Sequence, residues 1–251
     1  MSTNKYQRFA DLTYADFKEL AKDPSLSKYE KIGFPDAYRE GKEAAIFEDI
    51  KSKLSQLSEQ GKVVLDIGPG CSDLPAMLIE HCGAHAHKLL LVDSEEMLVL
   101  LPDLPFIKKY QGIYPSAIDD FDQLEGKVDV ILLYSVLHYI FVEGNIYSFL
   151  DKSLSLLSPG GQMLIGDIPN SSKRKRFFSS ETGVRFHQEF TQTKELPKME
   201  FLKIEDGQID DAVIMGLVNR ARSQGFDAYV LPQRPELPMA NRREDILIAR
   251  P

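Results

Sequence analysis

Short apolar runs alternate with amphipathic stretches along the middle of the chain, and this alternation predicts strands separated by helices. The apolar runs are rich in Val, Ile and Leu, as parallel strands covered on both faces are. Strands that alternate with helices form βαβ units, so the pattern favours an α/β domain around a parallel sheet. The predicted strands are residues 63–67, 89–92, 106–110, 128–134 and 162–167.

Two helices with clear boundaries are predicted in the second half of the chain. Residues 146–157 carry apolar side chains at spacings of three and four and stop at Ser-Pro-Gly-Gly, which suits a type II turn. Residues 208–224 form the other helix, with Asp210 and Asp211 in its first turn. Acidic side chains are favourable there because a helix N-terminus carries partial positive charge, and Gly225 is placed to cap the other end.

A hairpin is predicted after this last helix. Residues 227–231 and 245–249 have the composition of short strands, and the Pro-rich segment 232–243 joins them. A connection of that length without a helix favours antiparallel pairing at a sheet edge.

Residues 1–60 predict a helical cap ahead of the first strand. Thr13 and Asp16 resemble a capping box at the start of a short helix. Apolar positions within 47–57 mark a longer helix. The segment 27–39 between them is too rich in aromatic side chains for a plain linker, so we interpret it as a flap.

The size and charge of the chain limit its partners. A chain of 251 residues can bury one sizeable core, which favours a single α/β domain over 61–251 with a substrate-side insertion around 168–200. The formal net charge of −8 opposes binding to nucleic acid or to an anionic membrane, because such binding needs many cationic contacts. No apolar run approaches the roughly 18 residues of a membrane span. We therefore expect a small-molecule partner, and a homo-oligomer stays open.

The chain is expected in the cytoplasm. Its residues 1–8 lack the apolar core of a secretory signal. The two cysteines, Cys71 and Cys82, are too few for a disulfide framework, which agrees with a reducing compartment.

A glycine turn follows the first predicted strand. The strand carries Asp66 near its end and leads through Gly68, Pro69 and Gly70 into an apolar helix. Such a turn before a helix N-terminus lets backbone N–H groups approach an adenosyl cofactor. The spacing is Gly-x-Gly-x-x-Asp, so Asp73 stands where a dinucleotide fingerprint has its third glycine.

Five elements in order give residues 60–250 a resemblance to the class I S-adenosylmethionine-dependent methyltransferases. They are the Asp-x-Gly-x-Gly turn, the acid Asp93 that ends the second strand, the fourth strand with its tail, the Leu-Ser-Pro-Gly-Gly turn, and the terminal helix with its hairpin. The resemblance implies a three-layer αβα Rossmann-like fold with seven strands in the order 3-2-1-4-5-7-6, strand 7 antiparallel. It also implies that S-adenosylmethionine binds over the carboxyl ends of the strands.

The same resemblance implies cofactor contacts. Asp93, followed by Ser94, stands where a carboxylate accepts both ribose hydroxyls. Asp66 is placed to hold backbone donors or to balance the positive sulfonium. Ile113 is expected to flank the adenine, and Ser135 to lie beside the methionine part. The other expected cofactor contacts are those of the turn, Gly68, Pro69 and Gly70.

Methyl transfer needs an aligned acceptor and, for some acceptors, a base at the carboxyl end of the sheet. His138 lies just past the fourth strand and is the first candidate base, with a packing role as its alternative. Asp167 ends the fifth strand on the same side and is the second candidate, with loop ordering as its alternative. The expected substrate contacts are Tyr139, Arg174 and His187.

Two of these substrate contacts belong to the insertion. Arg174 is part of the basic run 173–176, which either holds an anionic group or forms a solvated face. His187 either folds over the pocket with the insertion or is an ordinary surface residue.

Four potential metal ligands cluster before the second strand, namely His81, Cys82, His85 and His87. Structural zinc sites pair two separated ligand doublets, whereas this cluster spans one helix end and the approach to a strand. We therefore expect no native metal.

Together these features predict a methyltransferase that uses S-adenosylmethionine to methylate an O or N nucleophile of a small molecule, with a sugar or surface-polysaccharide precursor as a suggested acceptor. An NAD-dependent oxidoreductase would also use a glycine turn and a strand-end acid, but Asp73 and the terminal hairpin disfavour it. The second alternative is a catalytically inactive subunit that keeps the methyltransferase fold for binding.

Overall fold

The structure is a computed structural model that describes residue 9 and residues 12–251. The prediction about a secretory signal concerns residues 1–8, which lie outside the described residues. The helices are α2 (Tyr14–Lys22), α3 (Lys28–Lys31), α4 (Asp36–Arg39), α5 (Glu43–Lys53), η1 (Ser55–Ser58), α6 (Asp73–Ala84), α7 (Glu95–Leu98), α8 (Phe121–Leu124), α9 (Leu137–Glu143), α10 (Ile146–Leu156), α11 (Ser171–Phe178), α12 (Glu181–Thr191) and α13 (Asp211–Ser223). The strands are β1 (Val63–Ile67), β2 (Lys88–Asp93), β3 (Ile107–Gln111), β4 (Val128–Tyr134), β5 (Leu157–Pro169), β6 (Asp227–Pro232) and β7 (Arg243–Ala249).

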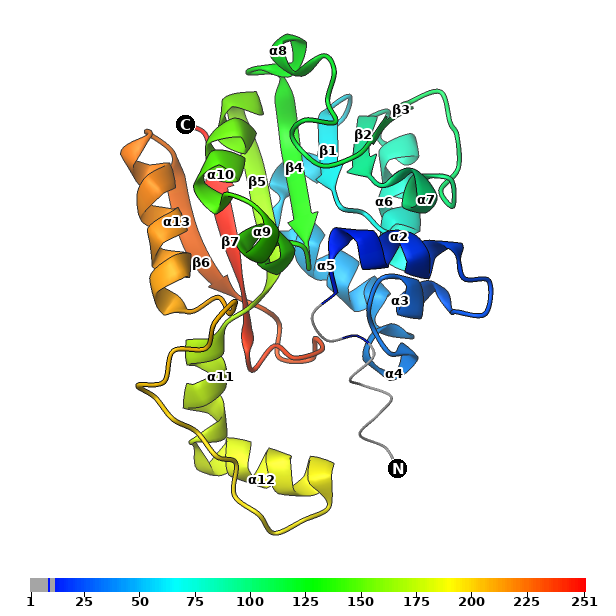
Figure 1. Ribbon diagram of the computed structural model, residues 1–251. Coiled ribbons are helices and arrows are strands. Elements are labelled where there is room, and N and C mark those ends of the chain that lie inside the picture. The colour runs from blue at the N-terminus through cyan, green and yellow to red at the C-terminus, as the bar shows by residue number, and fades with distance from the viewer. Residues whose placement is uncertain (1–8, 10–11) are drawn as a thin grey trace.

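The strands form one mixed sheet in the order β3-β2-β1-β4-β5-β7-β6 (Figure 1). β1 to β5 are parallel, whereas β7 runs antiparallel to both β5 and β6. The predicted strand order and the terminal hairpin are therefore confirmed.

Helices cover both faces of the sheet, and each strand sends alternate side chains into two cores. Leu65 and Ile67 of β1 belong to a core completed by α10 and α13. Val64 of the same strand belongs to the opposite core, completed by α5 and α6. Figure 1 shows α10 and α13 together on one side of the sheet. The domain is thus the expected three-layer αβα sandwich.

Local sequence signals set several element ends as predicted. Asp210 caps α13 by accepting a hydrogen bond from the Val213 N–H at 3.0 Å, and Gly225 follows the helix with φ of +89°. Thr13 and Asp16 form the predicted capping box of α2. The fifth strand, predicted over 162–167, is longer at both ends: Leu157 at its start pairs with Val128 of β4, and its last residues pair with β7.

The cap packs over the ends of β1 and β2. Two ion pairs join α2 to α7, from Lys18 and Lys22 to Glu96, each at 3.4 Å. The Tyr29 hydroxyl of α3 donates to the Asp73 carboxylate of α6 at 2.8 Å. These contacts hold the predicted flap directly above the glycine turn.

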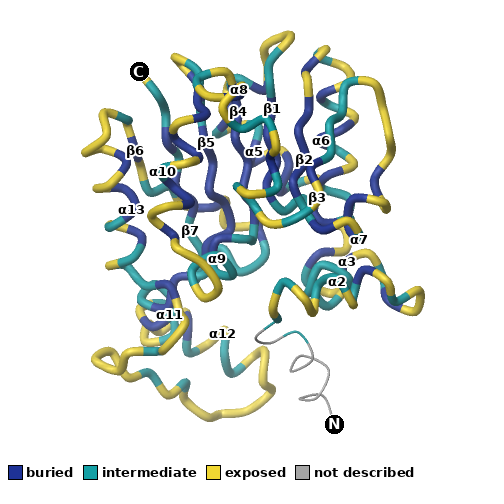
Figure 2. Tube along the Cα trace, turned by 45° about the horizontal axis from the view of Figure 1, so that its top comes forward, coloured by how far each residue is buried: buried dark blue, intermediate teal, exposed yellow. Residues whose placement is uncertain are grey.

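Residues 171–207, which we call the arm, leave the body of the protein after β5. Figure 2 shows that much of the arm is exposed, in contrast to the buried strands. Phe190 of α12 is 63% exposed, so an apolar side chain of this helix faces solvent. Across the described part of the chain, no helix combines the length and apolar character needed to cross a membrane.

Candidate active site

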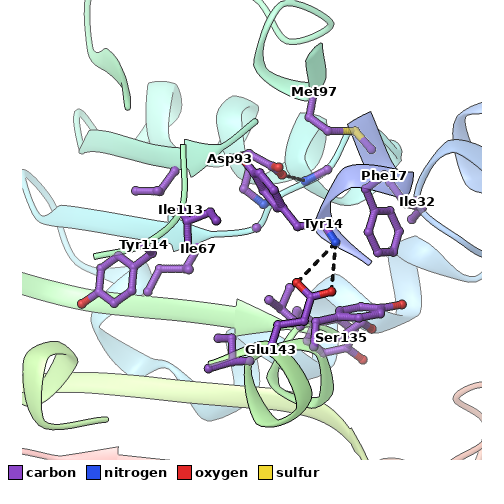
Figure 3. Close-up of a pocket in the computed structure, with 18 of the residues that line it drawn as sticks. Tyr14, Phe17, Ile32, Ile67, Asp93, Met97, Ile113, Tyr114, Ser135 and Glu143 are labelled. Atoms are coloured by element: carbon purple, nitrogen blue, oxygen red, sulfur yellow. Dashed lines mark hydrogen bonds between the residues drawn. The ribbon is translucent and has the colours of Figure 1, made fainter. Parts of the chain in front are cut away.

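A cavity of about 360 Å³ opens at the carboxyl ends of β1, β2 and β4 (Figure 3). The strand order reverses between β1 and β4, and open α/β sheets bind their ligands at such a reversal. The cap supplies the other wall with the aromatic side chains of Tyr14, Phe17 and Phe34. The predicted site residues that line this cavity are Gly68, Pro69, Gly70, Asp93, Ile113, Ser135 and Tyr139.

The glycine turn has both the conformation and the close contacts that require glycine. Gly68 has φ of +72°, and a Cβ there would lie 2.7 Å from Val136 Cγ2. Gly70 has φ of +65°, and a Cβ there would lie 2.6 Å from Ile32 Cγ2 of the flap. Both conformations are costly for any other residue. The turn therefore presents bare backbone to the cavity, as an adenosyl ligand needs.

Asp93 is partly buried at the end of β2, and the backbone holds its carboxylate. Its Oδ2 accepts a hydrogen bond from the Gly70 N–H at 3.0 Å, and its Oδ1 accepts one from the Ser94 N–H at 2.7 Å. Burial raises the pKa of Asp93 to about 6, although both hydrogen bonds favour the ionised form. The carboxylate keeps acceptor capacity toward the cavity, because each oxygen can accept two hydrogen bonds.

Two predicted cofactor contacts do not line the cavity. Ser94 turns away from it and caps α7, where its hydroxyl accepts a hydrogen bond from the Met97 N–H at 3.3 Å. Asp66 lies beneath the turn, where burial and the charge of Asp93 raise its pKa to about 8. A neutral Asp66 supports the turn from below and supplies no charge to a sulfonium.

Ser135 and Asp167 face each other across the ends of β4 and β5. Both have a left-handed backbone, with φ of +61° and +58°, which is uncommon for residues other than glycine. The Ser135 hydroxyl donates to Asp167 Oδ2, and its N–H donates to the Gly166 carbonyl at 3.0 Å. Such strain persists only where the surroundings hold it, and it gathers at functional sites.

Asp167 is the centre of a buried ionic network under the cavity floor. Arg39 of the cap donates to its Oδ2 at 3.1 Å, and Arg243 of β7 donates to the same atom at 2.6 Å. Gln233 donates to its other oxygen at 3.2 Å. Burial alone would raise the pKa of Asp167, but the two arginines and the hydrogen bonds from Ser135 and Gln233 lower it. The carboxylate is therefore ionised and fully engaged.

Arg39 and Glu43 are site residues that sequence reasoning missed. Both line the cavity, and both are almost completely buried. Arg39 also donates to Ser135 Oγ at 2.6 Å. Glu43 Oε2 accepts the Leu74 N–H at 2.7 Å, whereas its buried Oε1 has no partner among the described residues. The cavity thus offers one cation and one free carboxylate oxygen side by side with the turn.

The signal that could have found this pair is weak. Arg39 ends α4 in the aromatic flap, and Glu43 begins α5, so the two charges stand four residues apart in sequence. That spacing is common on solvated helices. The burial of Arg39 and Glu43 becomes evident only in the fold, which brings Arg39 to Asp167, 128 positions away in the sequence.

His138 and Tyr139 lie in the first turn of α9, but only Tyr139 lines the cavity. The two rings lie 3.8 Å apart, so His138 sits behind Tyr139. Burial first, and then the charge of Arg243, lower the pKa of His138 to about 3. Its Nδ1 is buried without a partner among the described residues. The imidazole is therefore neutral at physiological pH.

The buried His138 makes stability depend on pH. A histidine that titrates at about 6.5 when unfolded and near 3 when folded stabilises the fold fully above the higher value, and this contribution is lost as the pH falls below it. We expect the free energy of unfolding to fall more steeply between about pH 7 and 5 than in His138→Leu, by up to about 1.4 kcal/mol per pH unit. Urea unfolding of both proteins measures this, and parallel curves would contradict it.

The other two predicted substrate contacts lie on the arm and do not line the cavity. Arg174 of α11 forms an ion pair with Glu205, and His187 of α12 packs edge-on against Phe178. The arm projects away because α11 starts beyond the end of β5 and packs on α13 and α12 instead of on the cavity. A role for either residue needs a substrate larger than the cavity.

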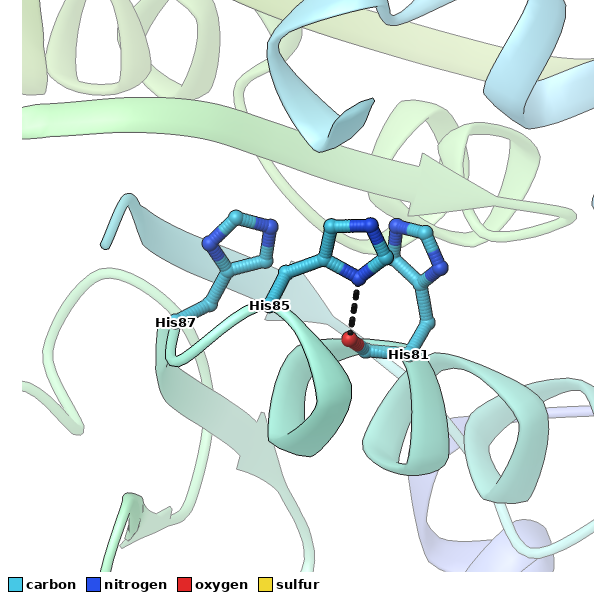
Figure 4. A group of neighbouring side chains, drawn as sticks. All are labelled: His81, His85 and His87. Carbon is cyan, nitrogen blue, oxygen red and sulfur yellow. Dashed lines mark hydrogen bonds between the residues drawn. The ribbon is translucent and has the colours of Figure 1, made fainter. Parts of the chain in front are cut away.

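The three histidines before β2 stand in a row at the opposite edge of the sheet (Figure 4). Their candidate ligand atoms lie within 4.8 Å of one another. His87 Nδ1 accepts the Lys62 N–H at 3.0 Å, so its Nε2 carries the proton and donates to the Leu57 carbonyl at 3.1 Å. His85 Nδ1 bonds the His81 carbonyl at 2.9 Å. These bonds leave the ring of His87 without a lone pair for a metal.

Solved structures of similar fold are methyltransferases. The plantazolicin methyltransferase BpumL, solved with a desmethylPZN analogue and SAH, matches with a TM-score of 0.58 at 13% identity over 98% of both chains. The N-methyltransferase NodS from Bradyrhizobium japonicum WM9, solved with S-adenosylhomocysteine, has a TM-score of 0.55 at 14% identity over 96% of this chain and 100% of its own. A SAM-dependent methyltransferase from Aquifex aeolicus has a TM-score of 0.52 at 14% identity over 95% and 98%.

No family model matches the chain, and no curated protein matches it in sequence. At identities this low the likeness concerns the fold. The protein has the fold of the class I S-adenosylmethionine-dependent methyltransferases, as its strand order and cavity position also show.

Proposed function

We propose that the protein is an S-adenosylmethionine-dependent methyltransferase that acts on an O or N nucleophile of a small molecule. One observation carries the proposal. A single cavity combines the bare glycine turn, the strand-end carboxylate of Asp93, and the buried pair of Arg39 and Glu43. The solved BpumL and NodS methyltransferases, which share the fold, contain S-adenosylhomocysteine.

The residues present fit each part of this cofactor. Asp93 can accept the two ribose hydroxyls, since it is a carboxylate at the end of β2 with acceptor capacity left. Ile113, which is 61% exposed at the cavity rim, offers an apolar surface to the adenine. The unpartnered Glu43 Oε1 suits the ammonium of the methionine part, and Arg39 suits its carboxylate.

Bound S-adenosylmethionine would supply a methyl carbon activated by positive sulfur, and the chain's own residues would position the acceptor. Phe17 of the cap meets Tyr139 edge-on at 4.9 Å, and together they cover the acceptor side of the cavity. Excluding water there strengthens the interactions that align the two reactants. The largely apolar wall favours an acceptor with an apolar or planar part. The suggested sugar or polysaccharide precursor stays a prediction.

The predicted catalytic residues fit different roles. Asp167 is engaged by two arginines and holds a low pKa, so we propose that it positions Arg39 and Ser135. His138 stays a prediction as the base: its Nδ1 has no partner among the described residues, but its ring lies behind Tyr139 outside the cavity lining, and burial lowers its pKa to about 3. This arrangement suits a nucleophile that needs no strong base, such as an uncharged amine.

A simple experiment can distinguish the proposed methyltransferase from the alternative, an NAD-dependent oxidoreductase. Asp73 is the first residue of α6, so its carboxylate stands at the helix N-terminus where a dinucleotide would place its pyrophosphate. Its charge is paired with Lys28 of the flap, so what disfavours the dinucleotide is the missing third glycine at this position. Parallel thermal-shift titrations are expected to show stabilisation by S-adenosylhomocysteine and none by NAD. Stabilisation by NAD alone would overturn the proposal.

A contact across the cavity mouth is expected to slow cofactor release. The Tyr14 N–H, at the start of α2, donates to both oxygens of the Glu143 carboxylate of α9, at 3.2 and 3.4 Å (Figure 3). Removing one charge-assisted hydrogen bond at this partly solvated site should speed release of S-adenosylhomocysteine about 3- to 10-fold. Stopped-flow displacement from Glu143→Ala measures this rate, with Glu125→Ala as the surface control. An unchanged rate would show that this contact does not hold the cap closed.

A further inference from the structure

Three arginines lie where the arm meets the start of β7. Arg174 comes from α11, Arg243 is the first residue of β7, and Arg242 directly precedes that strand. Two of the three are neutralised. Arg174 forms an ion pair with Glu205, and Arg243 forms one with Asp167 at 2.6 Å.

Arg242 differs because it has no carboxylate partner among the described residues. Its Nη1 donates to the neutral amide oxygen of Asn241 at 3.2 Å. The side chain is nevertheless partly buried. Burial first, and then the charges of Arg243 and Arg174, lower its pKa. A cation held among cations without an anion is unfavourable, unless a ligand supplies the missing charge.

The structure fixes Arg242 in place. The Arg242 N–H donates to the Met239 carbonyl at 2.9 Å, and its carbonyl accepts the Asn170 N–H at 3.0 Å. Met239 has φ of +61°, so the loop before Arg242 is strained as well as bonded. The guanidinium lies over the ring of Phe178 at 5.9 Å. A planar cation held in this way is preorganised to bind two oxygens of one anion.

Arg242 does not itself line the cavity, but the residue after it contacts a cavity wall. Arg243 stacks on Phe34 at 5.8 Å, and Phe34 lines the cavity. The charge of Tyr38 in α4 influences the pKa of Arg242, and Arg39, the next residue of that helix, lines the cavity too. A ligand that reaches Arg242 can therefore extend a second group into the cavity.

We propose that Arg242 binds an anionic group of the methyl acceptor, a phosphate or a carboxylate, while the nucleophile of the same molecule enters the cavity. This inference rests on the proposed function, because it concerns a second group on the molecule that the proposed methyltransferase would methylate. It also explains how a chain with a net charge of −8 can hold an anion, since the attraction is local to one arginine between cap and arm.

The test is isothermal titration at low ionic strength with inorganic pyrophosphate and, separately, with succinate. Three proteins are compared, namely the unaltered chain, Arg242→Gln and Arg185→Gln. Arg185 is an exposed arginine of α12 with no carboxylate partner among the described residues, so its variant changes net charge by the same amount. Whichever anion binds the unaltered chain identifies the group as phosphate-like or carboxylate-like.

We expect Arg242→Gln to weaken that binding about 10-fold or more, and Arg185→Gln to leave it unchanged. Arg242→Lys, which keeps the charge without the planar fork, should fall between the two. An equal loss in both glutamine variants, or no binding of either anion to the unaltered chain, would overturn the proposal. Titration with S-adenosylhomocysteine distinguishes failure of the two proposals. If the protein does not bind it, the proposed function is refuted. The anion proposal is judged separately, by the titrations of the arginine variants.

Discussion

Asp93→Ala is expected to lower the affinity for S-adenosylhomocysteine at least about 100-fold, because it removes two hydrogen bonds to a charged acceptor, each worth about 1.5–3 kcal/mol. The side chain is partly buried at the cavity and already fixed by the N–H groups of Gly70 and Ser94. No other carboxylate among the described lining residues ends a strand, so none can replace it.

Isothermal titration of the variant and of the unaltered chain measures this loss. Asp103→Ala is the matched control, since its side chain is 92% exposed and pairs with Lys109 at the surface. Asp93→Asn tests charge apart from volume. An affinity within threefold of the unaltered chain in Asp93→Ala would show that the ribose does not lie at this residue.

The same carboxylate predicts how cofactor binding depends on pH. Burial raises the pKa of Asp93 to about 6 in the free protein, and the ribose hydroxyls prefer the ionised form. Affinity should therefore be constant above about pH 7 and fall as the pH drops below about 6, approaching tenfold per unit. Asp93→Asn has no such titration and is expected to show a flat profile over this range.

Arg39→Met is expected to weaken S-adenosylhomocysteine about 10- to 100-fold, because a charge-assisted hydrogen bond to the methionine carboxylate is lost. Arg243→Met is the informative control. Both arginines donate to Asp167 Oδ2, so both variants should lower the free energy of unfolding by a similar amount, about 1–3 kcal/mol. Only Arg39 lines the cavity.

The pair of variants therefore separates stability from binding. Urea unfolding gives the first quantity and isothermal titration the second. Arg39→Lys, which keeps a positive charge at the same place, should recover part of the affinity. If Arg243→Met weakened the cofactor as much as Arg39→Met, the loss would come from a disturbed network, and the assignment of Arg39 to the methionine carboxylate would be wrong.

The strand order could be predicted because each of its signals is local. Asp66 with the glycine turn, the acid Asp93 at the end of β2, and the Ser-Pro-Gly-Gly sequence at the start of β5 each mark one element. Their order along the chain fixes a βαβ arrangement, and short connections leave few topologies. The antiparallel β7 follows from the missing helix between the last two strands.

The floor of the site could not be predicted in the same way. Asp167 was visible as a strand-end acid, but its partners come from residues 39 and 243, which no local pattern joins to it. The same contacts change its chemistry, since an acid held by two arginines is a poor base. His138 likewise had the right position after β4, yet its side chain packs behind Tyr139.

The insertion shows a third limit. The insertion around 168–200 was expected on the substrate side, with His187 either folded over the pocket or at the surface; its helices form the arm, and its residues do not line the cavity. Periodicity identifies such helices but not the direction in which they leave the sheet. That direction depends on packing of α11 against α13 and on ion pairs such as Arg176 with Asp211, which span distant parts of the chain.

Turnover with methyl-labelled S-adenosylmethionine and an extract of small molecules tests the central claim most directly. The account predicts a labelled product of low mass, formed together with S-adenosylhomocysteine, by the unaltered chain and not by Asp93→Ala. A protein that binds S-adenosylhomocysteine but labels nothing would contradict the enzymatic assignment and favour a binding subunit. Label found only on macromolecules would contradict the small-molecule acceptor.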